Sequence, residues 1–353
     1  MWAAEALKRE FAVSLIAAGQ IDLAQLNLFY GTTISSADVS IRSLPMPRVR
    51  AGKRAPSALR GAFGRRALKD FVHDHDILIS TYNLCDFGMP GIQCVADFSW
   101  DEDLRRRFDP APGGVHGLFH RSRSLRRCYL RLCETIAPPT GRDLFAGDDL
   151  IVANSHWTAT KLCERYGAVA RVVYPPVAGV FPDVSHERRY NDFVCIGRIS
   201  TEKRIERMIH IIDTVRSRGH DARIRIIGPL DASPYSNTIA SLAQRHREWV
   251  LLEGRKVGEE KARILAECRY GIHGREGEAF GIAVAEMVKA GCITFAPAEG
   301  GPAEILSHDA LLYYNDADAA QKIGTVIECE ALREKLIRLL RRGLRASVPA
   351  EHG

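Results

Sequence analysis

The chain has 353 residues, of which 46% are hydrophobic and 26% charged, and its formal net charge is +6. This composition excludes a disordered or fibrous protein, and the length indicates about two domains. Its nine cysteines contain no C-x-x-C pair, which argues against a disulfide framework and a zinc site and predicts a reducing, cytoplasmic compartment.

The first half alternates short apolar runs with helical stretches, which predicts an α/β domain with a parallel sheet. A doubly wound domain normally opens with a strand and a glycine turn, whereas Trp2–Arg9 reads as a helix. The first domain is therefore expected to lack its first strand and the loop after it. The predicted strands are Phe11–Ile16, Asp76–Thr81, Gly91–Ala96, Asp149–Asn154 and Arg171–Pro176, and the predicted helices are Asp22–Phe29, Ala58–Asp70, Ser122–Thr135 and His156–Tyr166.

Two arginine-rich segments, residues 48–69 and 121–131, interrupt this half. The ordinary interpretation is a solvated helix face, and the alternative is a surface for anionic membrane lipids. No aromatic stacking platform accompanies the arginines, so nucleic acid is not expected as a partner. The acidic run Asp74–Asp76 precedes a predicted strand and is interpreted as surface charge rather than a metal site.

The second half shows the βαβ pattern more clearly. Residues 177–190 are rich in proline, glycine and polar side chains and form a predicted linker between domains 1–176 and 191–320. Residues 321–353 are predicted to form C-terminal helices that pack back on the first domain, with a membrane-surface role of the basic helix as the alternative. The predicted strands are Phe193–Gly197, Arg223–Gly228, Val250–Gly254, Tyr270–Gly274, Cys292–Pro297 and Leu311–Tyr314, with helices near Glu202–Arg218, Glu259–Cys268 and Leu332–Ser347.

Two cations follow the first of these strands. Arg198 lies in the loop after Phe193–Gly197, and Lys203 lies in the first turn of the next helix. The free amides of a helix N-terminus already favour an anion. Arginine offers a forked donor and lysine a movable charge, which suits a diphosphate, although solvated basic residues are the more common case.

Two glutamates, Glu278 and Glu286, flank a small apolar run after another strand. In a helix their spacing corresponds to about 12 Å, which is too far for an acid/base pair but suits the two ends of a nucleotide sugar. We expect Glu278 to accept hydrogen bonds from the sugar, Glu286 from the ribose, and the amides of Phe280 and Gly281 to face the phosphates between them. The alternative is a surface helix with one glutamate buried by its own turn.

The Arg198-x4-Lys203 loop, the Glu278-x7-Glu286 segment and "EGGPAEI" (Glu299–Ile305), in this order, resemble the group 1 glycosyltransferases, or glycosyltransferase family 4. The upstream stretches "NSHWT" and "YPPV" are similar to that family too. The residues of these motifs most resemble the family's α-1,2-mannosyltransferase branch, which acts in lipid-linked oligosaccharide assembly. The resemblance implies two facing Rossmann-like domains, the GT-B architecture.

The same resemblance implies retaining, metal-independent transfer of a sugar from a GDP- or UDP-linked donor to a glycan or lipid-linked acceptor, without a cofactor. Arg198, Lys203 and Glu278 would be catalytic, and Gly300 and Gly301 would let the backbone approach the donor. The expected location is cytoplasmic, at the inner face of the membrane if the basic segments bind lipid.

Three departures from the family pattern leave alternatives open. The opening strand and loop are missing, Ala279 stands where glycine or histidine is common, and Asp97 stands near the place of a histidine that faces the donor sugar in relatives. The main alternative is a non-catalytic nucleotide-sugar binder with a degenerate first domain. A sugar-nucleotide epimerase is a third interpretation, but its histidine and carboxylate set has no obvious counterpart.

Overall fold

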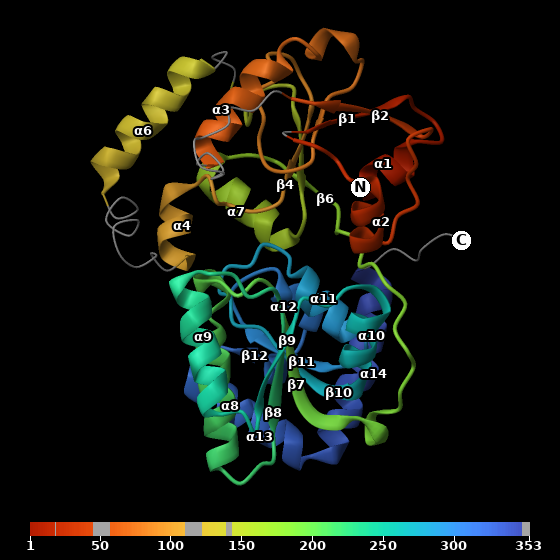
Figure 1. The fold of residues 1–353 in the computed structure, drawn as a ribbon, viewed down its shortest axis with the longest axis vertical. Helices are drawn as coiled ribbons and strands as arrows, with labels where there is room; N and C mark the ends of the chain where they lie inside the picture. The colour runs from red at the N-terminus through yellow and green to blue at the C-terminus, as the bar shows by residue number, and fades with distance from the viewer. Residues whose placement is uncertain (18, 45–56, 110–121, 139–142, 348–353) are drawn as a thin grey trace. The chain divides into compact units, whose positions relative to one another are not determined.

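The computed structural model of the chain describes residues 1–17, 19–44, 57–109, 122–138 and 143–347, and its contacts divide the chain into two units (Figure 1). Unit 1 comprises Met1–Ala96, Ala111–Ala153 and Ala159–Val172. Unit 2 comprises Asp97–Pro110, Asn154–Thr158 and Val173–Gly353. Both units are α/β with parallel sheets, as the sequence predicts.

Unit 2 contains one six-stranded parallel sheet in the order β12-β11-β10-β7-β8-β9. This is the doubly wound order in which the first strand, β7, lies in the centre. Parallel strands are covered on both faces, and Phe193 and Val194 of β7 are accordingly fully buried. The strands are β7 (Tyr190–Ile196), β8 (Arg223–Ile227), β9 (Val250–Gly254), β10 (Cys268–Ile272), β11 (Ile293–Pro297) and β12 (Leu312–Tyr313).

The helices of unit 2 cover this sheet with apolar faces, for example Ile211, Ile212 and Val215 of α8. They are α4 (Glu102–Phe108), η3 (His186–Arg188), η4 (Thr201–Lys203), α8 (Ile205–Ser217), α9 (Pro234–Arg245), α10 (Gly258–Glu267), α11 (Ile282–Lys289), α12 (Pro302–Leu306), η5 (Asp309–Leu311), α13 (Asp316–Glu328) and α14 (Glu330–Ser347).

The last helix, α14, has a partner that differs from the prediction. The sequence predicts that residues 321–353 pack on the first domain, whereas Leu336 and Leu340 of α14 are buried in the core of unit 2. Periodicity reveals that a helix has an apolar face but does not say which domain that face meets.

Unit 1 contains two separate parallel sheets, β1-β2 and β3-β4-β5-β6. Strand β2 was not among the predicted elements. The strands are β1 (Val13–Ala17), β2 (Val39–Ser43), β3 (Ile79–Ser80), β4 (Ile92–Val95), β5 (Leu150–Ala153) and β6 (Arg171–Val172). The helices are α1 (Trp2–Leu7), α2 (Leu23–Tyr30), α3 (Ser57–Leu68), η2 (Val72–Asp74), α6 (Arg123–Ile136) and α7 (His156–Tyr166), whose first residues belong to unit 2.

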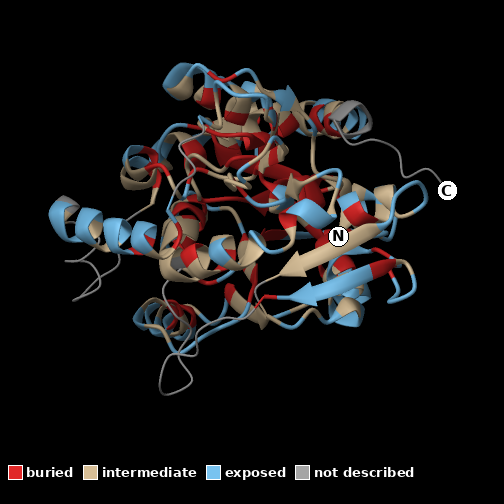
Figure 2. Ribbon diagram, turned by 90° about the horizontal axis from the view of Figure 1, so that it is seen from above, coloured by how far each residue is buried: buried red, intermediate tan, exposed pale blue. Residues whose placement is uncertain are grey.

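Burial differs between the two units (Figure 2). The core of unit 2 is continuous across its sheet. In unit 1 every residue of β1 is only half-buried, and β2 is exposed after Val39. No helix within the described ranges is long and apolar enough to cross a lipid bilayer.

Candidate functional site

The order of the strands in unit 2 gathers the predicted site residues. Strand β10 lies between β7 and β11. All three are parallel, so the loops that follow their carboxyl ends meet at one edge of the sheet. The loop after β7 carries Arg198 and Lys203, the loop after β10 carries Glu278, and the loop after β11 carries Gly300 and Gly301.

Lys203 and Glu278 form the centre of this edge. The Lys203 ammonium lies 2.6 Å from the Glu278 carboxylate, and both side chains are less than one-fifth exposed. The stem of Lys203 packs beneath Gly197, which has a φ of 151°. A left-handed residue, Arg204, then ends η4 and begins α8, so this turn directs the lysine back to the sheet edge.

The Glu278 carboxylate is held in its charged form. Burial by itself would raise its pKa, but the charge of Lys203, to which Arg275 adds, outweighs burial and holds the pKa of Glu278 well below its usual range. Burial lowers the pKa of His273, so this imidazole is neutral near pH 7. Its Nε2 lies 3.4 Å from Glu278 and forms no hydrogen bond with a described residue.

The position of Glu278 predicts an acid-sensitive stability. A carboxylate with a lowered pKa in the folded state stabilises the fold above its unfolded-state pKa, near 4.5. That contribution is lost as the pH falls through the folded-state value. We expect the free energy of unfolding to fall less steeply below about pH 4.5 in Glu278→Gln than in the wild type. Denaturant titrations between roughly pH 3 and 6 measure the slope, and exposed Glu259→Gln is the control.

Asp97 lies near a second ion pair, which joins Arg275 and Asp109. Arg275 lies 3.3 Å from Asp109 and 4.0 Å from Glu278. Burial raises the pKa of Asp109, and the charge of Asp97 contributes in the same direction. The sequence assigns Asp97 to the first domain, whereas its contacts place residues 97–110 in unit 2.

Two glycines bring the loop after β11 onto the loop of Glu278. Gly300 forms a parallel bridge with Glu278, and the Gly301 amide donates to the Glu278 carbonyl at 2.8 Å. A Cβ at Gly301 would lie 2.2 Å from the Ala279 carbonyl oxygen. From the family resemblance, these glycines are expected to let the backbone approach a donor. In the structure they also let two loops approach each other.

Phe280 and Gly281 lead into α11, which begins at Ile282. Gly281 has a φ of 95°, a conformation that favours glycine. In the part of the chain that the structure describes, neither amide donates a hydrogen bond to a protein acceptor. They therefore form a pair of free donors at the start of a helix, next to Glu278.

Glu286 lies on α11 and is almost fully buried. Its carboxylate accepts from the Lys261 ammonium at 2.6 Å, and Lys261 comes from α10. Lys261 was not among the predicted site residues. It is a cation at the expected ribose end of the site, and only its pairing with Glu286 distinguishes it from the other lysines of this basic chain.

Arg198 behaves differently from Lys203. Its side chain is 76% exposed, and its ion pair among the described residues is with Glu202, at 3.3 Å. Glu202 lies in the same short turn as Lys203. The guanidinium is therefore free to reorient toward a ligand, whereas Lys203 is already held in place by Glu278.

Segment "NSHWT" supports the loop of Glu278 from outside the sheet. The Ser155 hydroxyl donates to the Ala279 carbonyl at 2.5 Å. Glu304, on α12, accepts from the backbone amides of His156 and Trp157 at 3.0 and 2.6 Å. These contacts were not predicted, although both stretches belong to the motifs that carry the family resemblance.

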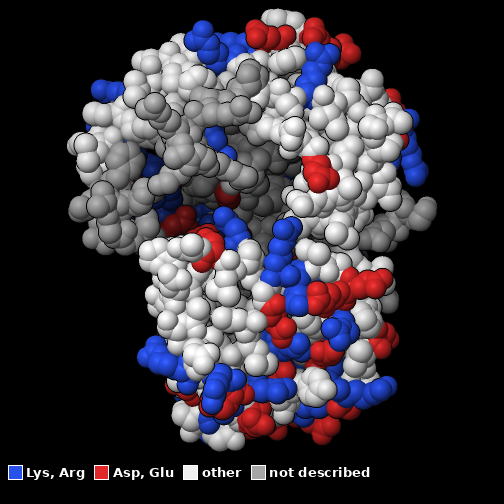
Figure 3. All heavy atoms as spheres, viewed as in Figure 1, with Lys and Arg blue, Asp and Glu red and all other residues white. Residues whose placement is uncertain are grey.

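Within the described ranges, no group of three or more His, Cys, Asp or Glu side chains is arranged to hold a metal ion. Positive charge at the site comes from side chains such as Lys203 and Lys261. Over the face of unit 2 seen in Figure 3, Lys and Arg are interspersed with Asp and Glu rather than gathered in one basic stripe.

The match to a known protein family lies within unit 2. Residues 181–342 match the family model of "Glycosyl transferases group 1". A Mus musculus protein described as GDP-Man:Man(3)GlcNAc(2)-PP-Dol alpha-1,2-mannosyltransferase is 28% identical over 171 residues, or 44% of this chain and 35% of that protein. A Candida glabrata protein of the same description is 28% identical over 172 residues, or 44% and 34%. The matches thus span about a third of the length of these relatives.

Solved structures resemble the whole chain in fold. WaaG, a glycosyltransferase involved in lipopolysaccharide biosynthesis, aligns with a TM-score of 0.63 at 14% identity over 94% of both chains. Anabaena HepE, solved in complex with UDP and glucose, aligns with a TM-score of 0.67 at 13% identity over 98% of this chain and 90% of its own. The predicted resemblance to group 1 glycosyltransferases and the GT-B fold class are therefore confirmed.

Proposed function

We propose that this chain, whose residues 181–342 carry a group 1 glycosyltransferase domain, moves a sugar from a nucleotide-diphosphate donor to an acceptor hydroxyl with retention of configuration. The observation that supports this most is the pair Lys203–Glu278 beside two free amides at the start of α11. A sugar diphosphate would use all three kinds of group: the cation and the backbone donors for its phosphates, and the carboxylate for its sugar hydroxyls.

Lys203 and Arg198 act on the leaving group. As the bond between the sugar and the diphosphate breaks, negative charge grows on the phosphate oxygen. Preorganised donors at that oxygen stabilise the transition state more than the ground state. In the free protein Lys203 and Glu278 satisfy each other, and the donor would bind across them, taking the ammonium for its phosphate and the carboxylate for its sugar hydroxyls.

The acceptor hydroxyl attacks from the face that the diphosphate leaves. Its proton passes to the departing phosphate oxygen, so the reaction needs no separate base, and the side-chain cations supply the charge that a metal would otherwise provide. Chelation with EDTA should leave turnover unchanged. The relatives' descriptions favour a GDP-mannose donor and a lipid-linked acceptor, and UDP-sugars are the second donor class to assay.

Glu286 is proposed to bind the ribose. Replacing it with alanine removes a charged acceptor, and we expect affinity for GDP or UDP to fall about tenfold. Isothermal titration measures this loss. Glu267→Ala, which breaks an ion pair with Arg225 at the other end of β10, is the matched control and should bind like the wild type. Unchanged affinity in Glu286→Ala would remove Glu286 from the site.

A turnover assay separates the enzyme from a non-catalytic binder. GDP-mannose and UDP-glucose are incubated with the protein, and release of GDP or UDP is followed with and without a polyprenyl diphosphate sugar acceptor. Nucleotide release that depends on Lys203 supports the enzyme. Tight binding of the donor without release would support the binder.

Helix α6 carries large exposed apolar side chains within the described part of the proposed membrane surface. Leu125 and Leu132 are 57% and 61% exposed and stand beside the exposed Arg127 and Arg131. Exposed leucines among arginines are typical of helices that lie on anionic membranes. Residues 48–56 and 121 of the two basic segments lie outside the described residues.

Flotation with vesicles of 30% phosphatidylserine tests this surface. We expect the floated fraction to fall at least about fivefold in Leu125→Glu/Leu132→Glu, because two charges replace the apolar contact. Val169→Glu, at another exposed position of unit 1, is the control. Equal flotation of all three proteins would exclude α6 as the membrane contact.

A further inference from the structure

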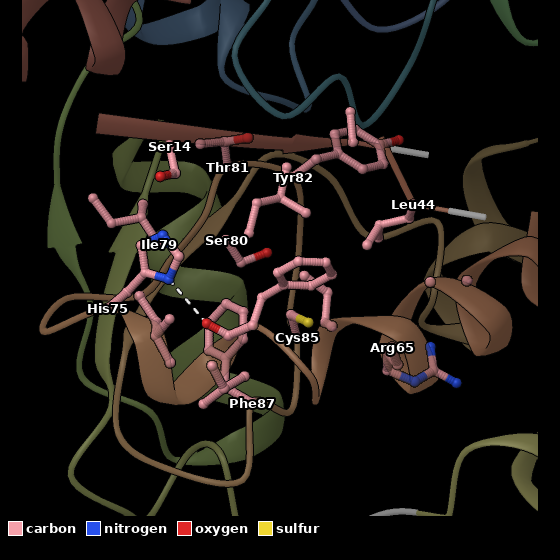
Figure 4. Close-up of a pocket in the computed structure, with 18 of the residues that line it drawn as sticks. Ser14, Leu44, Arg65, His75, Ile79, Ser80, Thr81, Tyr82, Cys85 and Phe87 are labelled. Carbon is pink, nitrogen blue, oxygen red and sulfur yellow. Dashed lines mark hydrogen bonds between the residues drawn. The ribbon is translucent and has the colours of Figure 1, made fainter. Parts of the chain in front are cut away.

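A large space in unit 1 and a small one in unit 2 differ in what they can hold. Unit 1 has a cavity of about 580 Å³, lined mainly by apolar side chains (Figure 4), and nothing among the described residues indicates its occupant. The space at the sheet edge of unit 2 is about 10 Å³, and Gly197, Lys203 and His273 line it. A space of that size holds no more than about one water molecule. The polar side chains around it must therefore find partners in one another or in a bound ligand.

His273 directly follows β10, and its side chain has an unpaired nitrogen. The residue is 3% exposed, and its Nε2 forms no hydrogen bond with a described residue. Its backbone amide donates to the Phe295 carbonyl at 2.9 Å, and its carbonyl accepts from the Tyr313 hydroxyl at 2.5 Å. Buried polar atoms without a partner are uncommon in folded proteins and require an explanation. Because the sheet fixes the backbone of His273, a partner has to come to the imidazole.

An acceptor for this nitrogen lies close by, but Lys203 occupies it. Oε2 of Glu278 lies 2.6 Å from the Lys203 ammonium and 3.4 Å from Nε2 of His273. The other carboxylate oxygen, Oε1, lies 4.0 Å from Arg275. We assign the imidazole proton to Nε2, because the carboxylate would repel a lone pair there. Burial lowers the pKa of His273, so the ring is a neutral donor near pH 7.

Binding of a sugar diphosphate would change the partners of Glu278. In the proposed function the diphosphate takes the Lys203 ammonium, which is the partner of Glu278 at 2.6 Å. A largely buried carboxylate that loses its counterion is strongly destabilised unless another donor replaces it. His273 lies beside the same oxygen. A shorter contact from Nε2 to Oε2 would hold the carboxylate in place and leave Oε1 for the sugar hydroxyls.

We propose that His273 is a positioning residue, which holds Glu278 for the sugar once the diphosphate has drawn Lys203 away. This inference rests on the proposed function. His273 transfers no proton in the reaction and acts only through Glu278. Its nitrogen, unpaired in the free protein, gains its acceptor in the donor complex, so the imidazole favours the complex over the free protein.

Two substitutions separate positioning from packing. His273→Leu removes the donor, and His273→Gln keeps a side-chain N–H. Isothermal titration compares GDP with GDP-mannose, or UDP with UDP-glucose if the wild type binds only these. His273→Leu should bind the sugar nucleotide about tenfold more weakly, while binding of the nucleoside diphosphate is nearly unchanged. Without the sugar, water can enter its place and hydrate Glu278. His273→Gln should regain most of the lost affinity.

His186→Leu is the matched control. His186 also has a buried Nε2 without a partner among the described residues, but it lies in η3, ahead of β7. Its carbonyl accepts from Arg269, at the amino end of β10, so it belongs to the opposite edge of the sheet from Glu278. This variant should bind both ligands like the wild type.

The outcomes distinguish this inference from the proposed function. An equal loss of affinity for both ligands in His273→Leu would assign His273 to packing and overturn the inference. Unchanged affinity for the sugar nucleotide would overturn it too, while the proposed function would stand. A wild type that binds neither kind of nucleotide would overturn the proposed function, and this inference with it.

A measurement on the wild type covers the case in which His273→Leu does not fold. In protein containing histidine labelled with nitrogen-15, the Nε2–H signal that is missing from His273→Gln belongs to His273. Adding the sugar nucleotide should move this signal downfield, because the hydrogen bond to the carboxylate shortens. A signal that stays in place when the sugar nucleotide is bound would contradict the proposed role of His273.

Discussion

Lys203→Ala is expected to lower kcat about 100-fold while the KM for the donor changes little, because the lysine meets charge that develops mainly in the transition state. Removing a single well-placed donor of this kind costs roughly 3 kcal/mol of activation free energy. The measurement is steady-state release of GDP or UDP from the donor. A surface lysine with a similar ion pair, Lys256 with Glu260, supplies the control Lys256→Ala.

The same substitution leaves Glu278 without its counterion, so stability must be measured alongside activity. Loss of one partner of a largely buried pair costs on the order of 3 kcal/mol. The double variant Lys203→Met/Glu278→Gln removes both charges and should regain most of that stability. It should remain inactive. If the double variant recovers activity together with stability, Lys203 has only a structural role.

Much of unit 2 could be predicted because its signals are local. Short apolar runs such as Phe193–Gly197, separated by amphipathic stretches, indicate parallel strands joined by helices, and β7, α8 and β8 lie where this pattern places them. Strand β2 escaped prediction because Val39–Ser43 carries only two apolar residues and is exposed after the first of them.

The partners inside the site could not be predicted, because they depend on contacts between distant segments. Lys261 and Glu286 are 25 residues apart, and Ser155 and Ala279 are 124 residues apart. The sequence predicts Arg198 and Lys203 together as the cations that bind the diphosphate. The left-handed turn at Arg204 determines which of them meets Glu278, and that turn uses a residue that seldom adopts a positive φ.

Gly301→Ala is expected to disable the site by displacing a loop, although it adds only one methyl group. Gly301 has a φ of −58°, which any residue adopts, so the substitution introduces no backbone strain of its own. The new Cβ would meet the Ala279 carbonyl oxygen at 2.2 Å and the Phe280 Cα at 2.7 Å. These are backbone atoms, which cannot rotate away as a flexible side chain would.

The loop of Gly301 must therefore move away from the loop of Glu278, and the 2.8 Å bond between them is lost. We expect a loss of about 1–3 kcal/mol in the free energy of unfolding, as for other overpacked sites, and a larger loss of donor affinity, since the free amides before α11 shift as well. Gly343→Ala is the matched control, because its Cβ would meet the Ile305 carbonyl at an ordinary contact distance of 3.8 Å. That change in α14 should be neutral or slightly stabilising. Donor affinity retained in Gly301→Ala would mean that contact between these two loops is not needed to hold the nucleotide sugar.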